Sequence, residues 1–79
     1  MDSGKANINS RTLYGQTALS IAAEYGHETV VKWLLDTGKA DINSKDTIYG
    51  RTPLWIAAEY GREAVIGQLL DTGKADINR

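Results

Sequence analysis

The sequence predicts an all-α fold, a short solenoid of two helix–turn–helix repeats joined by hairpin-like loops. Residues 15–43 and 50–78 pair at an offset of 35 positions, and only eight of the 29 pairs differ. Apolar residues in each copy recur at helical spacing, and glycines follow each predicted helix. Because helices this short are unstable alone in water, each pair must bury its apolar stripe against the other, as in a solenoid.

The first helix of each copy is expected to begin after a threonine. Thr17 and Thr52 are the predicted N-caps, and Pro53 takes the first helical position, where its missing N–H costs nothing. Gly26 and Gly61 are expected to end these helices. Their predicted apolar faces consist of Leu19, Ala22 and Ala23 in one copy and Leu54, Ala57 and Ala58 in the other.

A second helix follows in each copy and is expected to end at Gly38 or Gly73. Glu28 and Glu63 lie in its first turn, where a negative charge is favourable to the helix dipole. The predicted apolar stripe consists of Val30, Val31, Leu34 and Leu35, matched by Val65, Ile66, Leu69 and Leu70.

Polar segments containing Tyr-Gly follow the predicted helix pairs, and we expect them to form extended hairpin-like loops. The front of the chain holds a partial third copy, because residues 4–9 echo 38–43. The second loop carries one extra residue, within 46–49. We therefore expect one domain, residues 1–79, in which a partial loop at 4–14 precedes repeats at about 15–43 and about 46–78.

The composition argues against several kinds of partner. Nine basic and ten acidic residues leave a net charge of −1, so we expect no nucleic-acid partner and no membrane contact. The chain has no cysteine, which excludes a disulfide framework, a zinc finger and a thiolate nucleophile. No apolar run approaches the roughly 20 residues of a membrane span. We expect an intracellular, cytoplasmic protein without cofactor or metal.

No pattern of residues indicates catalysis. His27 is the only histidine, so it lacks an imidazole partner for a metal and is interpreted as a packing residue in the turn between helices. The glutamate pairs Glu24/Glu28 and Glu59/Glu63 straddle helix–turn junctions instead of facing one pocket. We therefore predict that the chain is not an enzyme and has no catalytic residues.

Residues 50–58, which read GRTPLWIAA, and Gly61 closely resemble the G-x-T-P-L-H-x-A-A-x-x-G core of the ankyrin repeat. The resemblance covers about residues 4–79, and it implies an ankyrin solenoid that binds a protein partner. The chain departs from the family pattern at Trp55, which stands in the place of histidine, and at Trp33, which replaces a medium-sized aliphatic residue.

The resemblance assigns partner binding to the loop tips, called fingers, and to the concave face of the first helices. Tyrosine offers a rigid amphipathic ring and is frequent at binding hot spots. For Tyr25 and Tyr60 the alternative is packing between the repeats. The predicted partner-binding residues are Leu13, Tyr14, Gln16, Glu24 and Tyr25 in the first repeat and Ile48, Tyr49, Arg51, Glu59 and Tyr60 in the second. Ile48 is also expected to lie against the first finger or another chain.

Self-association remains open as an alternative function. In that case the chain is an excised or engineered ankyrin fragment whose main property is homo-oligomer assembly. Two repeats leave both ends of the apolar core uncovered, whereas about three are normally needed for stability. A homodimer, an end-to-end oligomer, or the exchange of a helix pair through residues 44–50 would cover these ends. The candidate self-association residues are Trp33, Trp55, Ile66, Leu69 and Leu70.

Overall fold

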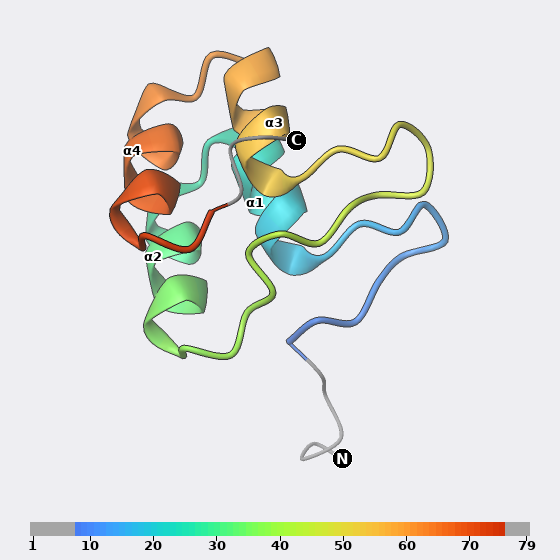
Figure 1. The fold of residues 1–79 in the computed structure, drawn as a ribbon, viewed down its shortest axis with the longest axis horizontal. Coiled ribbons are helices and arrows are strands. Elements are labelled where there is room, and N and C mark those ends of the chain that lie inside the picture. Colours follow the sequence, from blue (N-terminus) through green and yellow to red (C-terminus); the bar gives the residue numbers. More distant parts are fainter. Residues whose placement is uncertain (1–7, 76–79) are drawn as a thin grey trace.

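A computed structural model describes residues 8–75 and contains four helices in two pairs. The first pair is α1 (Ala18–Tyr25) and α2 (Glu28–Asp36), and the second is α3 (Pro53–Glu59) and α4 (Glu63–Asp71). The described part of the chain contains no strand, so the predicted all-α class is confirmed. Figure 1 shows α2 and α4 on one side of the molecule, α1 and α3 beside them, and two loops that project from the α1–α3 side.

The first helices begin as the sequence predicts. The Thr17 hydroxyl accepts a hydrogen bond from the Ser20 N–H at 3.2 Å, and the Ser20 hydroxyl accepts one from the Thr17 N–H at 2.9 Å. This reciprocal capping box satisfies two N–H groups that the helix itself leaves unpaired. Thr52 caps the Trp55 N–H at 3.2 Å, and Pro53 occupies the first helical position. Both predicted N-caps are therefore confirmed.

The core lies between the two helix pairs, and equivalent helices stack on each other, α1 on α3 and α2 on α4. Ala23 and Ala57 are fully buried, and their small side chains permit the close approach of α1 and α3. The buried apolar cluster consists of Leu19, Ala22, Ala23, Val31, Ala57, Val65 and Leu69. The expectation for Ala58 is wrong: it is exposed, because no further helix of the described chain lies behind α3.

Side chains of the second repeat also bond to the main chain of the first. Arg62 Nε donates to the Glu24 carbonyl at 2.9 Å, and Gln68 Nε2 donates to the Glu28 carbonyl at 3.1 Å. Both acceptors lie near the junction between α1 and α2. The contact between repeats therefore combines apolar burial with directed hydrogen bonds, which fix how one repeat sits on the other.

The first finger (residues 10–16) is a tight turn organised by Thr12. The Thr12 N–H donates to the Gln16 carbonyl at 2.9 Å. The Thr12 hydroxyl accepts hydrogen bonds from the Tyr14 and Gln16 N–H groups at 3.2 and 3.3 Å. A side chain that bonds to the backbone of its own turn in this way favours the turn over helix or strand.

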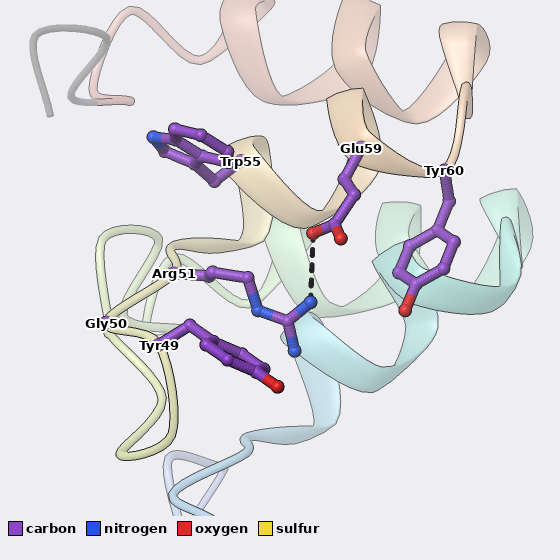
Figure 2. A pocket seen from close by; sticks show the side chains of 6 residues that line it. All are labelled: Tyr49, Gly50, Arg51, Trp55, Glu59 and Tyr60. Atoms are coloured by element: carbon purple, nitrogen blue, oxygen red, sulfur yellow. Dashed lines mark hydrogen bonds and ion pairs between the residues drawn. The ribbon is translucent and has the colours of Figure 1, made fainter.

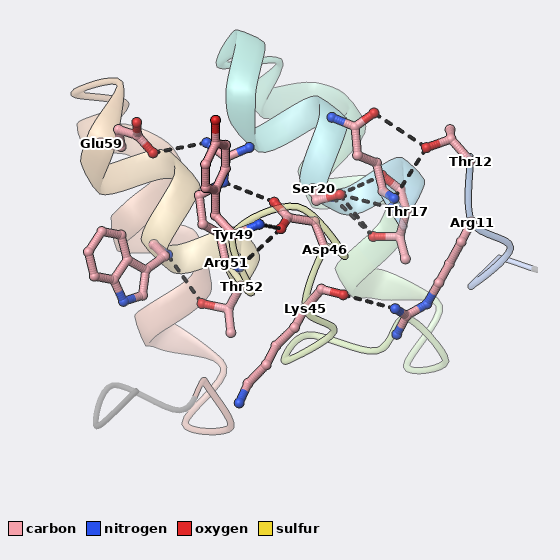
Figure 3. Close-up of polar contacts among 12 residues, drawn as sticks. Arg11, Thr12, Thr17, Ser20, Lys45, Asp46, Tyr49, Arg51, Thr52 and Glu59 are labelled. Carbon is pink, nitrogen blue, oxygen red and sulfur yellow. Dashed lines mark hydrogen bonds and ion pairs between the residues drawn. The ribbon is translucent and has the colours of Figure 1, made fainter. Parts of the chain in front are cut away.

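The second finger (residues 44–51) uses Asp46 for the same purpose. The Asp46 N–H donates to the Arg51 carbonyl at 3.0 Å, and Asp46 Oδ1 accepts from the Tyr49 N–H at 2.8 Å (Figure 3). Asp46 and Arg51 are five positions apart, whereas Thr12 and Gln16 are four apart. The extra residue predicted for this loop therefore lies inside the turn.

The two fingers lie side by side and project in the same direction (Figure 1). The Thr47 N–H donates to the Tyr14 carbonyl at 3.0 Å, and Arg11 Nη1 donates to the Lys45 carbonyl at 2.9 Å. Gly15 permits this pairing, because a Cβ at this position would meet the Thr47 backbone nitrogen at only 2.7 Å. The segment that was a candidate for helix exchange thus folds back within one chain.

Candidate protein-interaction surface

Four tyrosines form a repeated, exposed pattern. Tyr14 and Tyr49 lie on the fingers, Tyr25 is the last residue of α1, and Tyr60 follows α3 directly. Tyr25 is 58% exposed although the second repeat packs beside α1. Packing between the repeats, the alternative for Tyr25, is therefore wrong, since most of its side-chain surface stays in solvent.

The second repeat has a surface groove of about 640 Å³. The residues that line it are Tyr49, Gly50, Arg51, Trp55, Glu59 and Tyr60. Figure 2 shows the Tyr49 ring below the Arg51 guanidinium, with Trp55 and Glu59 on α3 above it and Tyr60 to one side. The fold thus gathers four of the five partner-binding candidates of the second repeat, and it adds Trp55, which was a self-association candidate.

Arg51 braces the groove from within. Its Nε donates to Asp46 Oδ2 at 2.9 Å, and its Nη1 donates to Glu59 Oε1 at 3.0 Å. Its guanidinium carbon lies 5.1 Å from the centre of the Tyr49 ring, a cation–π distance. Burial alone would lower the pKa of Arg51, but the hydrogen bonds to Asp46 and Glu59 raise it well above its usual value. The cation is already paired, so it holds Tyr49 and Glu59 in place.

Asp46 supports the groove through Arg51, and this role was not predicted from the sequence. Its carboxylate is buried and accepts hydrogen bonds from the Tyr49 N–H, the Arg51 N–H at 3.3 Å, and Arg51 Nε. Burial raises the pKa of this carboxyl, but these hydrogen bonds outweigh it and hold the pKa below its ordinary value. An aspartate just ahead of a Tyr-Gly turn is the available signal, because aspartate side chains cap such turns.

In the first repeat, four of the six positions equivalent to the groove residues carry the same residue. The two that differ are Gln16 in place of Arg51 and Ser20 in place of Trp55. Gln16 bonds to Thr12 in its own finger, and Ser20 is buried in the capping box. The predicted binding residues Leu13, Tyr14, Gln16, Glu24 and Tyr25 therefore lack the Arg51 and Trp55 side chains of the groove. Tyr25 instead lines a space of about 230 Å³ together with Gly61 and Arg62 of the second repeat.

The self-association candidates do not form one patch. Trp33 is exposed on α2, whereas Trp55 lies in the groove on α3. Leu70 is exposed on α4, and Ile66 is partly buried against the core. The assignment of Leu69 to a free surface is wrong: this side chain is 0% exposed, because it faces the first repeat within the same chain.

Residues 8–75 contain neither a cluster of metal-binding side chains nor a membrane-spanning helix. These residues include no group of three or more His, Cys, Asp or Glu side chains placed to hold a metal ion. No helix among them is long and apolar enough to cross a membrane. The His27 side chain is exposed, and its ring lies 6.1 Å from the Tyr25 ring.

Two comparisons relate the sequence to known proteins. A family model described as ankyrin repeats (three copies) matches residues 2–79. A stretch of 43 residues is 49% identical to the ankyrin repeat protein FPV230 of Fowlpox virus (strain NVSL). That stretch is 54% of this chain and 22% of the viral protein, so the chain matches a small part of a longer relative.

Proposed function

Because the chain belongs to the ankyrin repeat family, whose repeats generally serve as protein-interaction modules, we propose that it binds a segment of a partner protein along its fingers and first helices. The contact surface consists of Tyr14, Tyr25, Tyr49 and Tyr60 and includes the groove beside α3. The proposal assigns the chain no catalytic role, in keeping with a family that is typically non-catalytic.

The exposed tyrosines, repeated at equal positions in both repeats, are the observation that carries this proposal. An exposed aromatic ring gains little from the fold, whereas at an interface it buries a large area with few rotatable bonds. Two rings lie on fingers and two at the ends of first helices, so a bound segment can cross both repeats. We infer that the tyrosines act as anchors in the binding of the partner.

The hydrogen bonds inside the groove support the same conclusion. Arg51 connects the second finger, through Asp46, to α3, through Glu59. Such a brace fixes the Tyr49 ring before a partner arrives, and a pre-organised surface loses less conformational entropy on binding. Since Arg51 is already satisfied, we expect the partner to present apolar or aromatic side chains to the groove, with polar groups at its rim.

Peptide selection tests the proposal and does not require an identified partner. Random linear peptides displayed on phage are selected on the wild-type chain, and the affinities of the enriched peptides are then measured by titration. Replacement of Tyr25 and Tyr60 by serine should weaken binding at least about tenfold if the rings are hot spots. The matched control is Lys32→Ala, an exposed position on α2 outside the surface, which should leave the affinity unchanged.

Two results would contradict the proposed surface. One is selected peptides that bind the tyrosine variant as tightly as the wild type while circular dichroism shows an intact fold. The other is a loss of affinity in Lys32→Ala equal to that in the tyrosine variant, because binding would then involve the α2 side of the molecule.

A further inference from the structure

The contact inside the chain shows which side of a repeat meets its neighbour. In the second repeat, Arg62 and Gln68 donate to carbonyls of the first repeat, and Val65 between them is 0% exposed. On the second finger, Thr47 donates to the Tyr14 carbonyl. We call the side that packs onto the preceding repeat the front side. In the second repeat it is defined by Thr47, Arg62, Val65 and Gln68.

The same side of the first repeat is uncovered. The residues at the equivalent positions are His27 for Arg62, Val30 for Val65 and Trp33 for Gln68. His27 and Trp33 are exposed, and Val30 is 38% exposed where Val65 is fully buried. His27 and Trp33 stand where the second repeat has Arg62 and Gln68, but imidazole and indole rings also carry N–H donors. The first repeat therefore keeps the donor and apolar groups with which the second repeat packs.

The opposite, rear side of the second repeat is uncovered in the same way. In the first repeat, Gly15 is buried against Thr47 of the second finger, and Ser20 is buried as well. Their counterparts are Gly50 and Trp55. A Cβ at Gly50 would have no neighbour within 4 Å, and Trp55 is 52% exposed where Ser20 is 3%. The rear side of the second repeat therefore has open space beside Gly50. On the first repeat, the second finger fills the equivalent space beside Gly15.

We propose that copies of this chain stack head to tail, the front face of one on the rear face of the next. The front face consists of Leu13, His27, Val30 and Trp33, and the rear face consists of Gly50, Trp55, Ile66 and Leu70. Leu35, the counterpart of Leu70 in the first repeat, lines a space with Gln68 and Asp71 of α4, which places this helix position on the rear side. The rear face shares Gly50 and Trp55 with the groove of the proposed partner-binding surface, so a stacked copy would cover part of that groove. Tyr25 stays exposed with a repeat packed beside it, so Tyr60 stays accessible in the stack.

The finger contact gives Leu13 a place in this stack. Leu13 directly follows Thr12, as Thr47 directly follows Asp46, so it is the equivalent of the residue that covers Gly15. In the single chain Leu13 is 97% exposed, an unfavourable position for an apolar side chain. On the rear face of a second copy it would cover Gly50 and leave solvent.

The sizes of the facing groups also agree. The first finger is one residue shorter than the second, so it reaches less far over the repeat on which it packs. Trp55 is much larger than its counterpart Ser20. In the stack the shorter finger would meet the larger side chain, which would fill part of the space left by the missing finger residue.

Two hydrogen bonds complete the stack. Within the chain, the acceptors of Arg62 and Gln68 are the carbonyls of Glu24 and Glu28. The equivalent glutamates of the second repeat are Glu59 and Glu63. In the stack, the His27 and Trp33 rings of one copy would donate to these carbonyls of the other. The contact is heterologous and does not close on itself, so the assembly would grow with concentration.

One variant blocks each face in the test. Trp33→Glu places a charge on the front face, and Leu70→Glu places one on the rear face. Both side chains are exposed, so the fold should tolerate the changes. Sedimentation velocity is recorded from low to high micromolar concentration for the wild type, for each variant, and for their equimolar mixture. The expected wild-type mass rises beyond two chains, and each variant alone associates at least about tenfold more weakly.

The mixture is the decisive sample. Leu70→Glu keeps a free front face and Trp33→Glu keeps a free rear face, so the mixture should form a heterodimer and stop at two chains. A wild-type chain that stays monomeric overturns the proposal. So does a mixture that fails to associate, or either variant forming a homodimer as tight as the wild type, because that result indicates a two-fold contact between like faces.

A readout without substitution accompanies the mass measurement. The chain has two tryptophans, one on each face, so their emission should shift to shorter wavelength as the concentration rises. Unchanged emission across the same range also contradicts the proposal. The double variant of Tyr25 and Tyr60 to serine should associate like the wild type, so failure of the stack and failure of the proposed partner-binding surface are distinguishable.

Discussion

Asp46 and Thr12 organise the two fingers with different chemistry. A hydroxyl makes neutral hydrogen bonds to the N–H groups of the first finger, whereas a carboxylate bonds to N–H groups and to the Arg51 guanidinium in the second. Hydrogen bonds to ionised groups are about twice as strong as neutral ones. The second finger is therefore tied to α3, through Arg51 and Glu59, in a way that the first finger is not tied to α1.

Asp46→Ala should lower the free energy of unfolding by about 2–3 kcal/mol, because it leaves the Tyr49 N–H and a largely buried guanidinium without their acceptor. Urea denaturation monitored by circular dichroism measures the change. The control is Asp36→Ala, whose carboxylate makes only an exposed pair with Lys32 and should cost at most about 0.5 kcal/mol. Equal losses in the two variants would show that the buried position of Asp46 contributes nothing.

The same carboxylate should make the stability depend on pH. Because the pKa of Asp46 is lower in the folded chain than the unfolded value of about 3.9, its contribution is complete above that value. The contribution is lost as the pH falls through the folded pKa, where the carboxylate becomes protonated. The stability difference between wild type and Asp46→Ala should therefore be constant near neutral pH and shrink in acid. A difference that grows in acid would have the wrong sign.

Alanine substitutions at Gly15 and Gly50 measure how much the contact between the two fingers contributes to stability. Both have φ near +70°, where a side chain costs about 1 kcal/mol in either position. Only at Gly15 would a Cβ also meet Thr47, at 2.7 Å. Gly15→Ala should therefore destabilise by at least about 1 kcal/mol more than Gly50→Ala. Thermal unfolding at low micromolar concentration compares them, and equal melting temperatures would mean that the fingers separate at little cost.

At the scale of the helices, local signals were sufficient for most of the fold. Threonine caps, the proline after Thr52 and the recurring glycines mark helix ends through contacts within a few residues. The pairing of Arg51 with Glu59, eight positions away, has no such local signal. Leu69 and Leu70 are both apolar residues of the predicted α4 stripe, but only Leu69 faces the first repeat. Which of the two is buried depends on the position of the neighbouring repeat, and this position is not written in the local sequence.

The two caps suggest a stabilising substitution in α1. Ala18 occupies the position that Pro53 occupies in α3, and it is exposed. Thr17 has φ −94° and ψ 168°, close to the φ −85° and ψ 166° with which Thr52 precedes its proline. Ala18→Pro should therefore fit without strain and raise the free energy of unfolding by about 0.5–1 kcal/mol. Urea denaturation measures the gain, and a loss of stability would show that the first cap needs the freedom of alanine.

At the scale of the molecule, the core is shared between the repeats. Val65 and Leu69 are fully buried against the first repeat, and the helices have only seven to nine residues each. Neither helix pair has a complete core of its own, and isolated helices of this length are unstable. The positions of residues within one repeat were predictable from the sequence, whereas the difference between covered and uncovered ends required the three-dimensional stack.

It follows that the two repeats should unfold together, in a single two-state transition. Each repeat contains one tryptophan, so Trp55→Phe leaves a reporter in the first repeat and Trp33→Phe leaves one in the second. Both side chains are exposed, and a change to phenylalanine should alter stability by less than about 1 kcal/mol. Within each variant at low micromolar concentration, urea curves from fluorescence and from circular dichroism should coincide. If the fluorescence transition of either variant precedes the loss of helix, the repeat that holds the remaining tryptophan unfolds alone. The shared core would then contribute less to stability than its burial indicates.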